Sequence, residues 1–148
     1  ETGHIVFGTL HTNRAQGTVN RIIDAFPGNL QDQIRTQLAR TLIGVVAQTL
    51  LPRIGGGRCA SYEVLNVTPG VANLIRENKT FRINSAMQTG AKFGMQLMDD
   101  ALFHHWKEER VSVEEVLAKA HRPDDLAKRI VQSRRGEGDD AIPVPQEE

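Results

Sequence analysis

Hydrophobic and polar residues follow two periodicities along the chain, one typical of strands and one typical of helices. Residues 4–10 form a short apolar run rich in β-forming side chains, which predicts a strand buried in a parallel sheet. Three polar residues follow at positions 11–13, at what would be the carboxyl end of that strand. Apolar residues then recur at helical spacing from Val19 to Phe26, and Pro27 ends this predicted helix.

A second, longer helical pattern follows. Apolar residues step by three or four from Leu30 to Thr49, which predicts one long amphipathic helix. Asn29 is placed to cap the amino end of this helix. Near Gln48 we expect the helix to give way to a strand.

The next segment predicts a β-hairpin. The first strand runs through residues 50–54 and contains Pro52, which favours an edge strand because proline cannot donate a backbone hydrogen bond. Three glycines at positions 55–57 predict the turn, since glycine accepts positive φ without strain. Residues 59–64 alternate small or polar with larger side chains and predict the returning strand.

The sequence from Thr68 to residue 133 predicts several short helices, which a C-terminal tail follows. The signals are an N-cap at Thr68 before Pro69, an apolar segment at 81–88, an apolar stripe from Met95 to Trp106, a capping box at 112–115 and a proline start at Pro123. Asn78 is placed to end the first of these helices in a left-handed turn. From Arg134 onward the chain has little to bury, so we expect disorder.

Four blocks of sequence carry a family resemblance that covers roughly residues 1–98. GHIVFGTLHTN followed by RIIDAFP closely resembles the His box of PilT-like type IV pilus retraction ATPases, which belong to the secretion-ATPase superfamily. The blocks QTLLPRIGGGR, TPGVANLIRENK and SAMQTG continue it in order. The resemblance implies an α/β fold, namely the distal part of a RecA-like P-loop NTPase core followed by an α-helical C-terminal region. The corresponding divisions are residues 1–66, 67–134 and a disordered tail at 135–148.

The same resemblance implies a function for the parent protein. Its relatives are hexameric motors that use ATP and Mg²⁺ to power pilus retraction and twitching motility. The implied partners are ATP, further copies of the chain in a homo-hexamer and the pilus platform protein of the inner membrane, with no nucleic acid. The implied location is the cytoplasm, peripheral at the inner membrane through the pilus machinery.

Charge and cysteine content add little to this picture. The formal net charge is zero, but Lys and Arg outnumber Asp and Glu by 10 to 5 through Met98, and the counts are 8 against 13 from Asp99 onward. The basic half suits an anionic partner such as a nucleotide phosphate, and it suits an acidic subunit surface equally well. Cys59 is the only cysteine, which excludes an intrachain disulfide and favours a reducing compartment.

The sequence lacks the phosphate loop of such motors. No G-x-x-x-x-G-K-S/T segment occurs, and the glycines at 55–57 lack the following Lys and Ser/Thr. In the family, the phosphate loop and the acidic segments that organise Mg²⁺ lie upstream of the His box. The chain therefore looks like the C-terminal part of a longer motor. We expect no cofactor on this chain alone and no ATP hydrolysis by it.

Two histidines flank the first predicted strand. His4 and His11 are seven residues apart, so strand geometry places them on opposite faces and they are not expected to act as a pair. Taken alone, a histidine at a strand end is more often structural. The family resemblance makes His11 a sensor of the terminal phosphate, and it supports a catalytic role for His4 less strongly.

Neighbouring polar residues complete the predicted nucleotide-sensing loop. Thr9, Thr12 and Asn13 offer hydroxyl and amide groups that can position water or tie the loop to the strand. The alternative, that they only cap the following segment, is equally open. Arg14 stands where small residues such as Ser are common in the family.

The block TPGVANLIRENK resembles the family's retraction signature, AIRNLIRE. The matching residues are Asn73, Leu74, Ile75, Arg76 and Glu77. Ala72 departs from the family pattern by replacing an arginine. The resemblance implies that this motif serves retraction rather than hydrolysis.

Other candidate chemistry is weak. Helical neighbours such as His104 and His105 point about 100° apart, so we expect no metal site. The acidic doublets at 114–115 and 124–125 fall in first helical turns, where they favour the helix dipole. Two alternative functions stay open: a segment of a pilus-extension or type II secretion ATPase, and a non-catalytic oligomerisation module.

Overall fold

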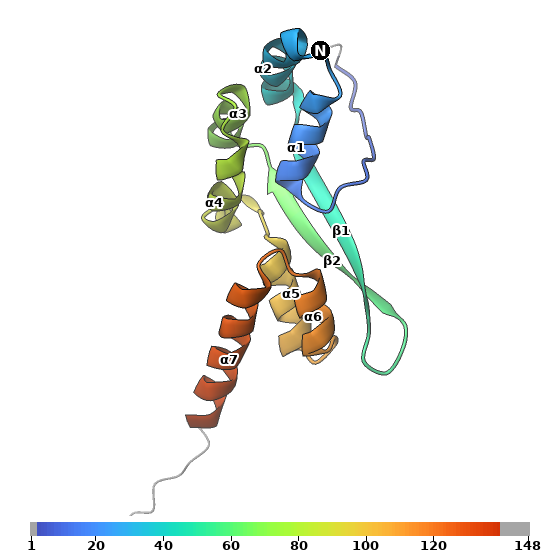
Figure 1. Cartoon of the computed structure of the whole chain (residues 1–148), viewed down its shortest axis with the longest axis vertical. Coiled ribbons are helices and arrows are strands. Elements are labelled where there is room, and N and C mark those ends of the chain that lie inside the picture. The colour runs from blue at the N-terminus through green and yellow to red at the C-terminus, as the bar shows by residue number, and fades with distance from the viewer. Residues whose placement is uncertain (1–2, 140–148) are drawn as a thin grey trace, which may run out of the picture.

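The computed structural model describes residues 3–139 and has two groups of helices joined by a long β-hairpin (Figure 1). The elements are α1 Ala15–Asp24, α2 Gln31–Thr41, β1 Gly44–Pro52, β2 Arg58–Asn66, α3 Pro69–Arg76, α4 Ile83–Gln88, α5 Met98–Lys107, α6 Val113–Lys119 and α7 Pro123–Asp139. Single 3-10 turns lie at Gly28–Leu30, Thr80–Arg82 and Ala91–Phe93. The chain is an α/β protein, as the sequence predicts.

The β-hairpin formed by β1 and β2 connects the two groups of helices. Strands β1 and β2 pair antiparallel from Gly44 opposite Asn66 to Pro52 opposite Arg58. The glycines at 55–57 all have positive φ, between 79° and 105°, which explains why the turn uses three residues without a Cβ. The predicted hairpin is therefore confirmed, although β1 begins earlier, at Gly44, and ends at Pro52 instead of residue 54, and β2 is longer than predicted.

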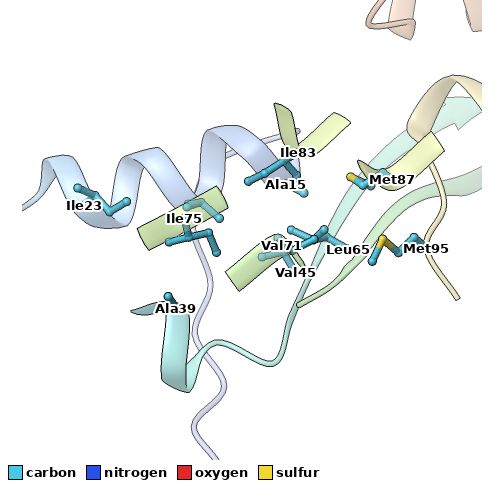
Figure 2. Packing of buried hydrophobic residues seen from close by; sticks show 11 residues of the cluster. Ala15, Ile23, Ala39, Val45, Leu65, Val71, Ile75, Ile83, Met87 and Met95 are labelled. Atoms are coloured by element: carbon cyan, nitrogen blue, oxygen red, sulfur yellow. The ribbon is translucent and has the colours of Figure 1, made fainter. Parts of the chain in front are cut away.

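Two hydrophobic clusters lie at opposite ends of this hairpin. The first cluster (Figure 2) joins α1–α4 to the β1 start and β2 end, and it contains Ala15, Val19, Ile23, Ala39, Val45, Leu65, Val71, Ile75, Ile83, Met87 and Met95. The second joins α5–α7 to the other end of the hairpin, and it contains Leu51, Met98, Leu102, Phe103, Val111, Val116, Leu126 and Ile130. The hairpin therefore contributes to both cores.

The predicted long helix is wrong beyond Thr41, where α2 ends. Strand β1 already begins at Gly44, and its burial alternates, so that Val45 is buried while Val46 is exposed. The β-branched side chains there suit a strand, and their spacing of three or four from the preceding leucines only mimics a helix. Asn29 is not the cap of α2 either: it lies in a 3-10 turn, and the N-cap position is Leu30, without a side-chain hydrogen bond.

The predicted buried strand at residues 4–10 is also wrong. This segment has no regular structure, and its apolar side chains are exposed, by 86% for Val6 and 94% for Phe7. A strand needs a neighbouring strand for its backbone hydrogen bonds. Among the described residues, the sheet has two strands and they pair with each other.

Several predicted helix ends are confirmed. Thr68 accepts a hydrogen bond from the Val71 N–H at the start of α3, and Ser112 accepts one from the Glu115 N–H at the start of α6. Asn78 has a φ of 59°, as its place after α3 predicts.

The end of the chain differs from the prediction in part. Helix α7 continues to Asp139, so the disorder predicted from Arg134 is wrong for residues 134–139, while residues 140–148 lie outside the described residues. The division of the chain at positions 66 and 134 stays a prediction, and the first cluster contains residues from both sides of position 66.

Two adjacent leucines of β1 test the strand register. The Leu51 side chain is fully buried in the second cluster, whereas Leu50 is 46% exposed on the opposite face. We expect Leu51→Ala to lower the free energy of unfolding by about 2–5 kcal/mol and Leu50→Ala to lower it by about 0.5 kcal/mol. Urea denaturation of both variants checks this, and equal losses would contradict the alternation along β1.

Candidate functional site

The predicted sensing loop lies at the surface immediately before α1. His11, Thr9 and Asn13 are exposed, whereas Thr12 is half-buried. The Thr12 hydroxyl lies 2.5 Å from the hydroxyl of Thr18 in α1, which ties the loop to the second turn of that helix. His4 is exposed on the same extended segment.

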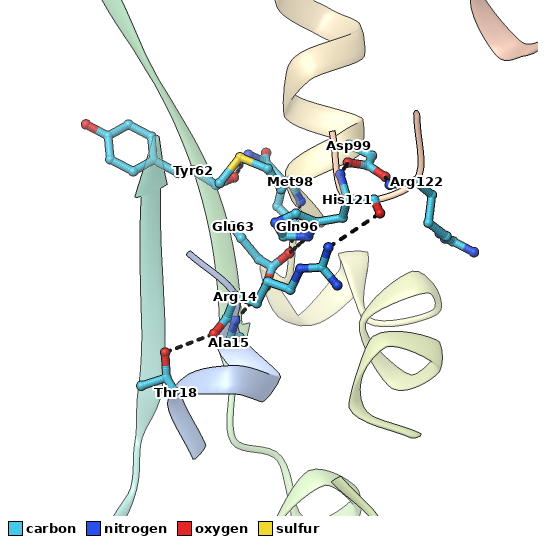
Figure 3. Close-up of polar contacts among 10 residues, drawn as sticks. All are labelled: Arg14, Ala15, Thr18, Tyr62, Glu63, Gln96, Met98, Asp99, His121 and Arg122. Atoms are coloured by element: carbon cyan, nitrogen blue, oxygen red, sulfur yellow. Dashed lines mark hydrogen bonds and ion pairs between the residues drawn. The ribbon is translucent and has the colours of Figure 1, made fainter. Parts of the chain in front are cut away.

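One buried carboxylate lies where this loop meets the helical region (Figure 3). Glu63 of β2 has an exposed fraction of 1%. Its Oε1 accepts a hydrogen bond of 2.7 Å from the Ala15 N–H, at the start of α1. Its Oε2 accepts one of 3.3 Å from the Met98 N–H, at the start of α5, and lies 3.4 Å from Nδ1 of His121.

These contacts explain how two helices begin without a local cap. The N-cap residues are Arg14 for α1 and Leu97 for α5, and neither side chain caps its helix. The first N–H groups of a helix need acceptors, and a negative charge there also favours the helix dipole. The Glu63 carboxylate on β2 supplies the hydrogen-bond acceptor and the negative charge to the first turn of each helix.

The turn between α6 and α7 is held by a second carboxylate. Asp99 accepts hydrogen bonds from the N–H groups of His121, at 2.7 Å, and Arg122, at 2.9 Å. The guanidinium of Arg14 donates to the His121 carbonyl at 3.4 Å. The sensing loop, α5 and the start of α7 therefore meet around Glu63 and His121.

The electrostatics of the cluster favour a charged Glu63. Burial on its own raises the pKa of this carboxyl, but hydrogen bonding to His121 and to the N–H groups of Ala15 and Met98 outweighs that effect. The net result is a pKa below the ordinary value for glutamate. Glu63 is therefore a carboxylate at neutral pH.

A cavity of about 280 Å³ adjoins this cluster. Its walls include Asn13 and Arg14 from the loop, Thr49 from β1, and Lys119 and His121 from the segment before α7. The sensing loop and the helical region thus face each other across a polar space.

The predicted retraction motif lies on α3 and in the residue that follows it (Figure 1). Ile75 is fully buried and Leu74 is partly buried against the first cluster. The polar members point outward: Arg76 donates to Asn73 at 2.5 Å, and Glu77 pairs with Lys79 at 2.8 Å.

The charge state of the exposed Glu77 follows from its neighbour. The hydrogen bond from Lys79, followed by the attraction of the same ammonium group, holds the pKa of Glu77 below its usual range. The outer side of α3 therefore presents both a cation and an anion at neutral pH.

Sequence reasoning missed Glu63, Asp99 and His121. A signal for Glu63 was present, because strand alternation places position 63 on the same buried face as Leu65. A second signal was the lack of a capping side chain at Arg14 and Leu97. The first signal indicates a buried carboxylate and the second indicates helix starts that need an acceptor, but neither shows that Glu63 binds these helix starts.

The described residues hold neither a candidate metal site nor a helix that could span a membrane. Within residues 3–139, no group of three or more His, Cys, Asp or Glu side chains is arranged to hold a metal ion. His105 instead places its Nε2 3.1 Å from the Ala60 carbonyl oxygen. No helix in the same range is long and apolar enough to cross a lipid bilayer.

The lowered pKa of Glu63 predicts a pH-dependent stability. Its contribution is fully present above the pKa of the unfolded state, about 4.3, and is lost as the pH falls through the lower pKa of the folded state. We expect Glu63→Gln to lower the free energy of unfolding by about 2–3 kcal/mol at pH 7 and by less in acid. Urea denaturation from pH 7 to pH 3 checks this, with Glu114→Gln, on an exposed glutamate, as the control; a difference independent of pH would contradict it.

Comparison with known proteins identifies a family. Residues 1–134 match the family model described as Type II/IV secretion system protein. The chain is 43% identical over 126 residues to the type IV pilus retractation ATPase PilT of Pseudomonas aeruginosa, covering 85% of this chain and 37% of that protein. It is 52% identical over 103 residues to a twitching motility protein of Neisseria gonorrhoeae, covering 69% of this chain and 28% of that protein.

A solved structure agrees with this result. The crystal structure of the pilus retraction motor PilT with bound ADP matches with a TM-score of 0.78 at 43% sequence identity, over 86% of this chain and 36% of that one. The match confirms the predicted resemblance and the α/β, RecA-like fold class. The chain spans about a third of the length of these relatives. It belongs to the Type II/IV secretion system protein family.

Proposed function

We propose that this chain is a segment of a hexameric motor ATPase that powers type IV pilus retraction and twitching motility. In this proposal it supplies the phosphate sensor of the His box and the helices that transmit motion. The observation that carries the proposal is the position of His11, exposed in a loop whose next residues, Arg14 and Ala15, bind the buried cluster around Glu63. The names of the relatives support pilus retraction as the process.

The residues of the loop have distinct roles in this proposal. The His11 imidazole donates a hydrogen bond to the terminal phosphate of ATP and so distinguishes ATP from ADP. His4, at the other end of the extended segment, is a second catalytic candidate, which the family resemblance supports less strongly. Thr9, Thr12 and Asn13 position the loop and its water, and the contact between the Thr12 and Thr18 hydroxyls supports the positioning role of Thr12.

The residues of this chain do not by themselves fit a Mg²⁺–ATP site. The glycines at 55–57 form the hairpin turn and are not followed by Lys and Ser/Thr. No acidic cluster suited to a cation occurs among residues 3–139. We therefore assign the binding of ATP and Mg²⁺ to the complete protein, in which phosphoryl transfer depends on positioning and charge stabilisation.

The outward side of α3 is our candidate for force transmission. Asn73, Arg76 and Glu77 are exposed, while Leu74 and Ile75 anchor the helix in the first cluster. In the proposed motor these polar groups contact a neighbouring subunit of the homo-hexamer. The motor itself acts in the cytoplasm, at the inner membrane, against the pilus platform protein.

A non-catalytic oligomerisation module is the second candidate. The observation in its favour is the exposed apolar segment that contains Ile5, Val6 and Phe7. Exposed apolar side chains in a row favour association with another surface. A pilus-extension or type II secretion ATPase segment is a third candidate that shares the same motor chemistry.

A complementation assay separates a motor segment from an association module. We expect no Mg²⁺-dependent ATP turnover from the pure chain, and turnover when the upstream half of a retraction ATPase is supplied in trans. His11→Ala should lower that rate by about 10-fold to 100-fold, the effect of losing one hydrogen bond to a charged group. His104→Ala, at an exposed histidine of α5, is the matched control. Turnover that is indifferent to His11→Ala would favour the association module.

A second experiment tests the role of α3. We expect Arg76→Ala to change the free energy of unfolding by about 0.5 kcal/mol or less, because the side chain is exposed, and to leave ATP turnover of the complemented motor unchanged. Twitching motility of cells that carry the variant in the full-length motor should fall. Arg21→Ala, at an exposed arginine of α1, controls for loss of charge. Normal motility with Arg76→Ala would exclude this residue from force transmission.

A further inference from the structure

We propose that Glu63 is a positioning residue that couples the loop carrying His11 to α5 and to the turn that begins α7. The inference rests on the proposed function, because it assigns to Glu63 the transfer of the sensing loop's position to the helical region. It concerns a contact within this chain, so it can be tested without the rest of the motor.

The geometry of the carboxylate carries the proposal. Its two oxygens bind different parts of the structure: Oε1 accepts from the Ala15 N–H at 2.7 Å, and Oε2 accepts from the Met98 N–H at 3.3 Å. The same Oε2 lies 3.4 Å from Nδ1 of His121. A planar group bound at both oxygens cannot follow a displacement on one side without moving relative to the other.

Burial makes the loss of a partner of Glu63 costly. The Glu63 side chain is 1% exposed, so its oxygens have almost no contact with solvent while their partners are in place. A buried polar group that loses its partner costs about 1–3 kcal/mol, and more if it is charged. Displacement of Ala15 is therefore costly unless the carboxylate and its other partners move with it.

The contacts extend from this carboxylate in both directions. On the loop side, the Thr12 hydroxyl contacts Thr18 at 2.5 Å, so a movement of His11 is transmitted to α1. On the helical side, Asp99 binds the N–H groups of His121 and Arg122 immediately before α7. The helix that begins there packs Leu126 and Ile130 into the second cluster.

The chain offers a variant that cuts one contact selectively. His121 binds Glu63 through its ring, whereas it binds Asp99 and Arg14 through its backbone N–H and carbonyl. His121→Ala therefore removes the contact with Glu63 and leaves the two backbone contacts in place. It also serves as a second variant in case Glu63→Gln prevents folding.

The experiment perturbs the loop and measures the response at a distance. Thr12→Val removes the hydroxyl that contacts Thr18 and keeps the size of the side chain. Amide hydrogen exchange, followed by NMR on the full 148-residue chain, reports on Ala15, Met98 and Arg122. In the chain without other substitutions we expect Thr12→Val to raise the exchange rates at all three positions about threefold to thirtyfold, which lies within the range of couplings between contacting groups.

Thr12→Val is then combined with a second substitution, and each combination should give a different pattern of exchange rates. With Glu63→Gln, the response to Thr12→Val should remain at Ala15, disappear at Met98 and weaken at Arg122, because Arg14 still contacts the His121 carbonyl. With His121→Ala it should remain at Ala15 and Met98 and weaken at Arg122, where the backbone contacts with Asp99 and Arg14 stay in place. The control Glu114→Gln, which makes the same chemical change at an exposed site, should leave all three responses intact.

Two outcomes overturn the proposal. One is a response to Thr12→Val that stops at Ala15, or is absent, in the otherwise unchanged chain. The other is an undiminished response at Met98 with Glu63→Gln, or at Arg122 with His121→Ala, which would make Glu63 a helix cap and nothing more. Failure of the proposed function is seen separately, as turnover of the complemented motor that does not depend on His11.

Discussion

The structure depends on one buried charge and on how it is satisfied. Removing a carboxylate from water is expensive, and the cost is tolerable only where hydrogen bonds and opposite charge compensate for it. At Glu63 the compensation comes from the starts of α1 and α5 and from the His121 ring. These partners belong to segments that are distant in sequence, so satisfying one side chain fixes their relative positions.

Glu63 lies on the hairpin between the two hydrophobic clusters, so its hydrogen bonds affect how the clusters are aligned. Along β2, Leu65 belongs to the first hydrophobic cluster, and Cys59 packs against the second. Apolar contacts within each cluster are non-directional and tolerate small shifts. The carboxylate lies between the two clusters and is directional, so it sets the alignment that hydrophobic burial alone leaves loose.

Local features of the fold were predictable from the sequence, and long-range ones were not. The glycine turn at 55–57 and the caps Thr68 and Ser112 depend on neighbours within a few residues. By contrast, Ala15 and Glu63 are 48 residues apart. The apolar run at 4–10 shows a different failure: its composition suits a buried strand, but burial depends on partners that local composition does not specify. For the candidate site, the sequence indicated His11 and its loop through family resemblance, and it gave no partner for Glu63.

The shared cap also affects which residues the helix starts can accept. Helices prefer Ser, Thr, Asp, Asn or Gly at the N-cap position. Positions 14 and 97 carry Arg and Leu, and Glu63 provides from across the fold an acceptor for the N–H groups of Ala15 and Met98. The Arg14 side chain, which caps no helix, donates a hydrogen bond to the His121 carbonyl. In evolutionary terms, the acid on the strand leaves both positions open to change, and its loss would favour a polar cap at each of them.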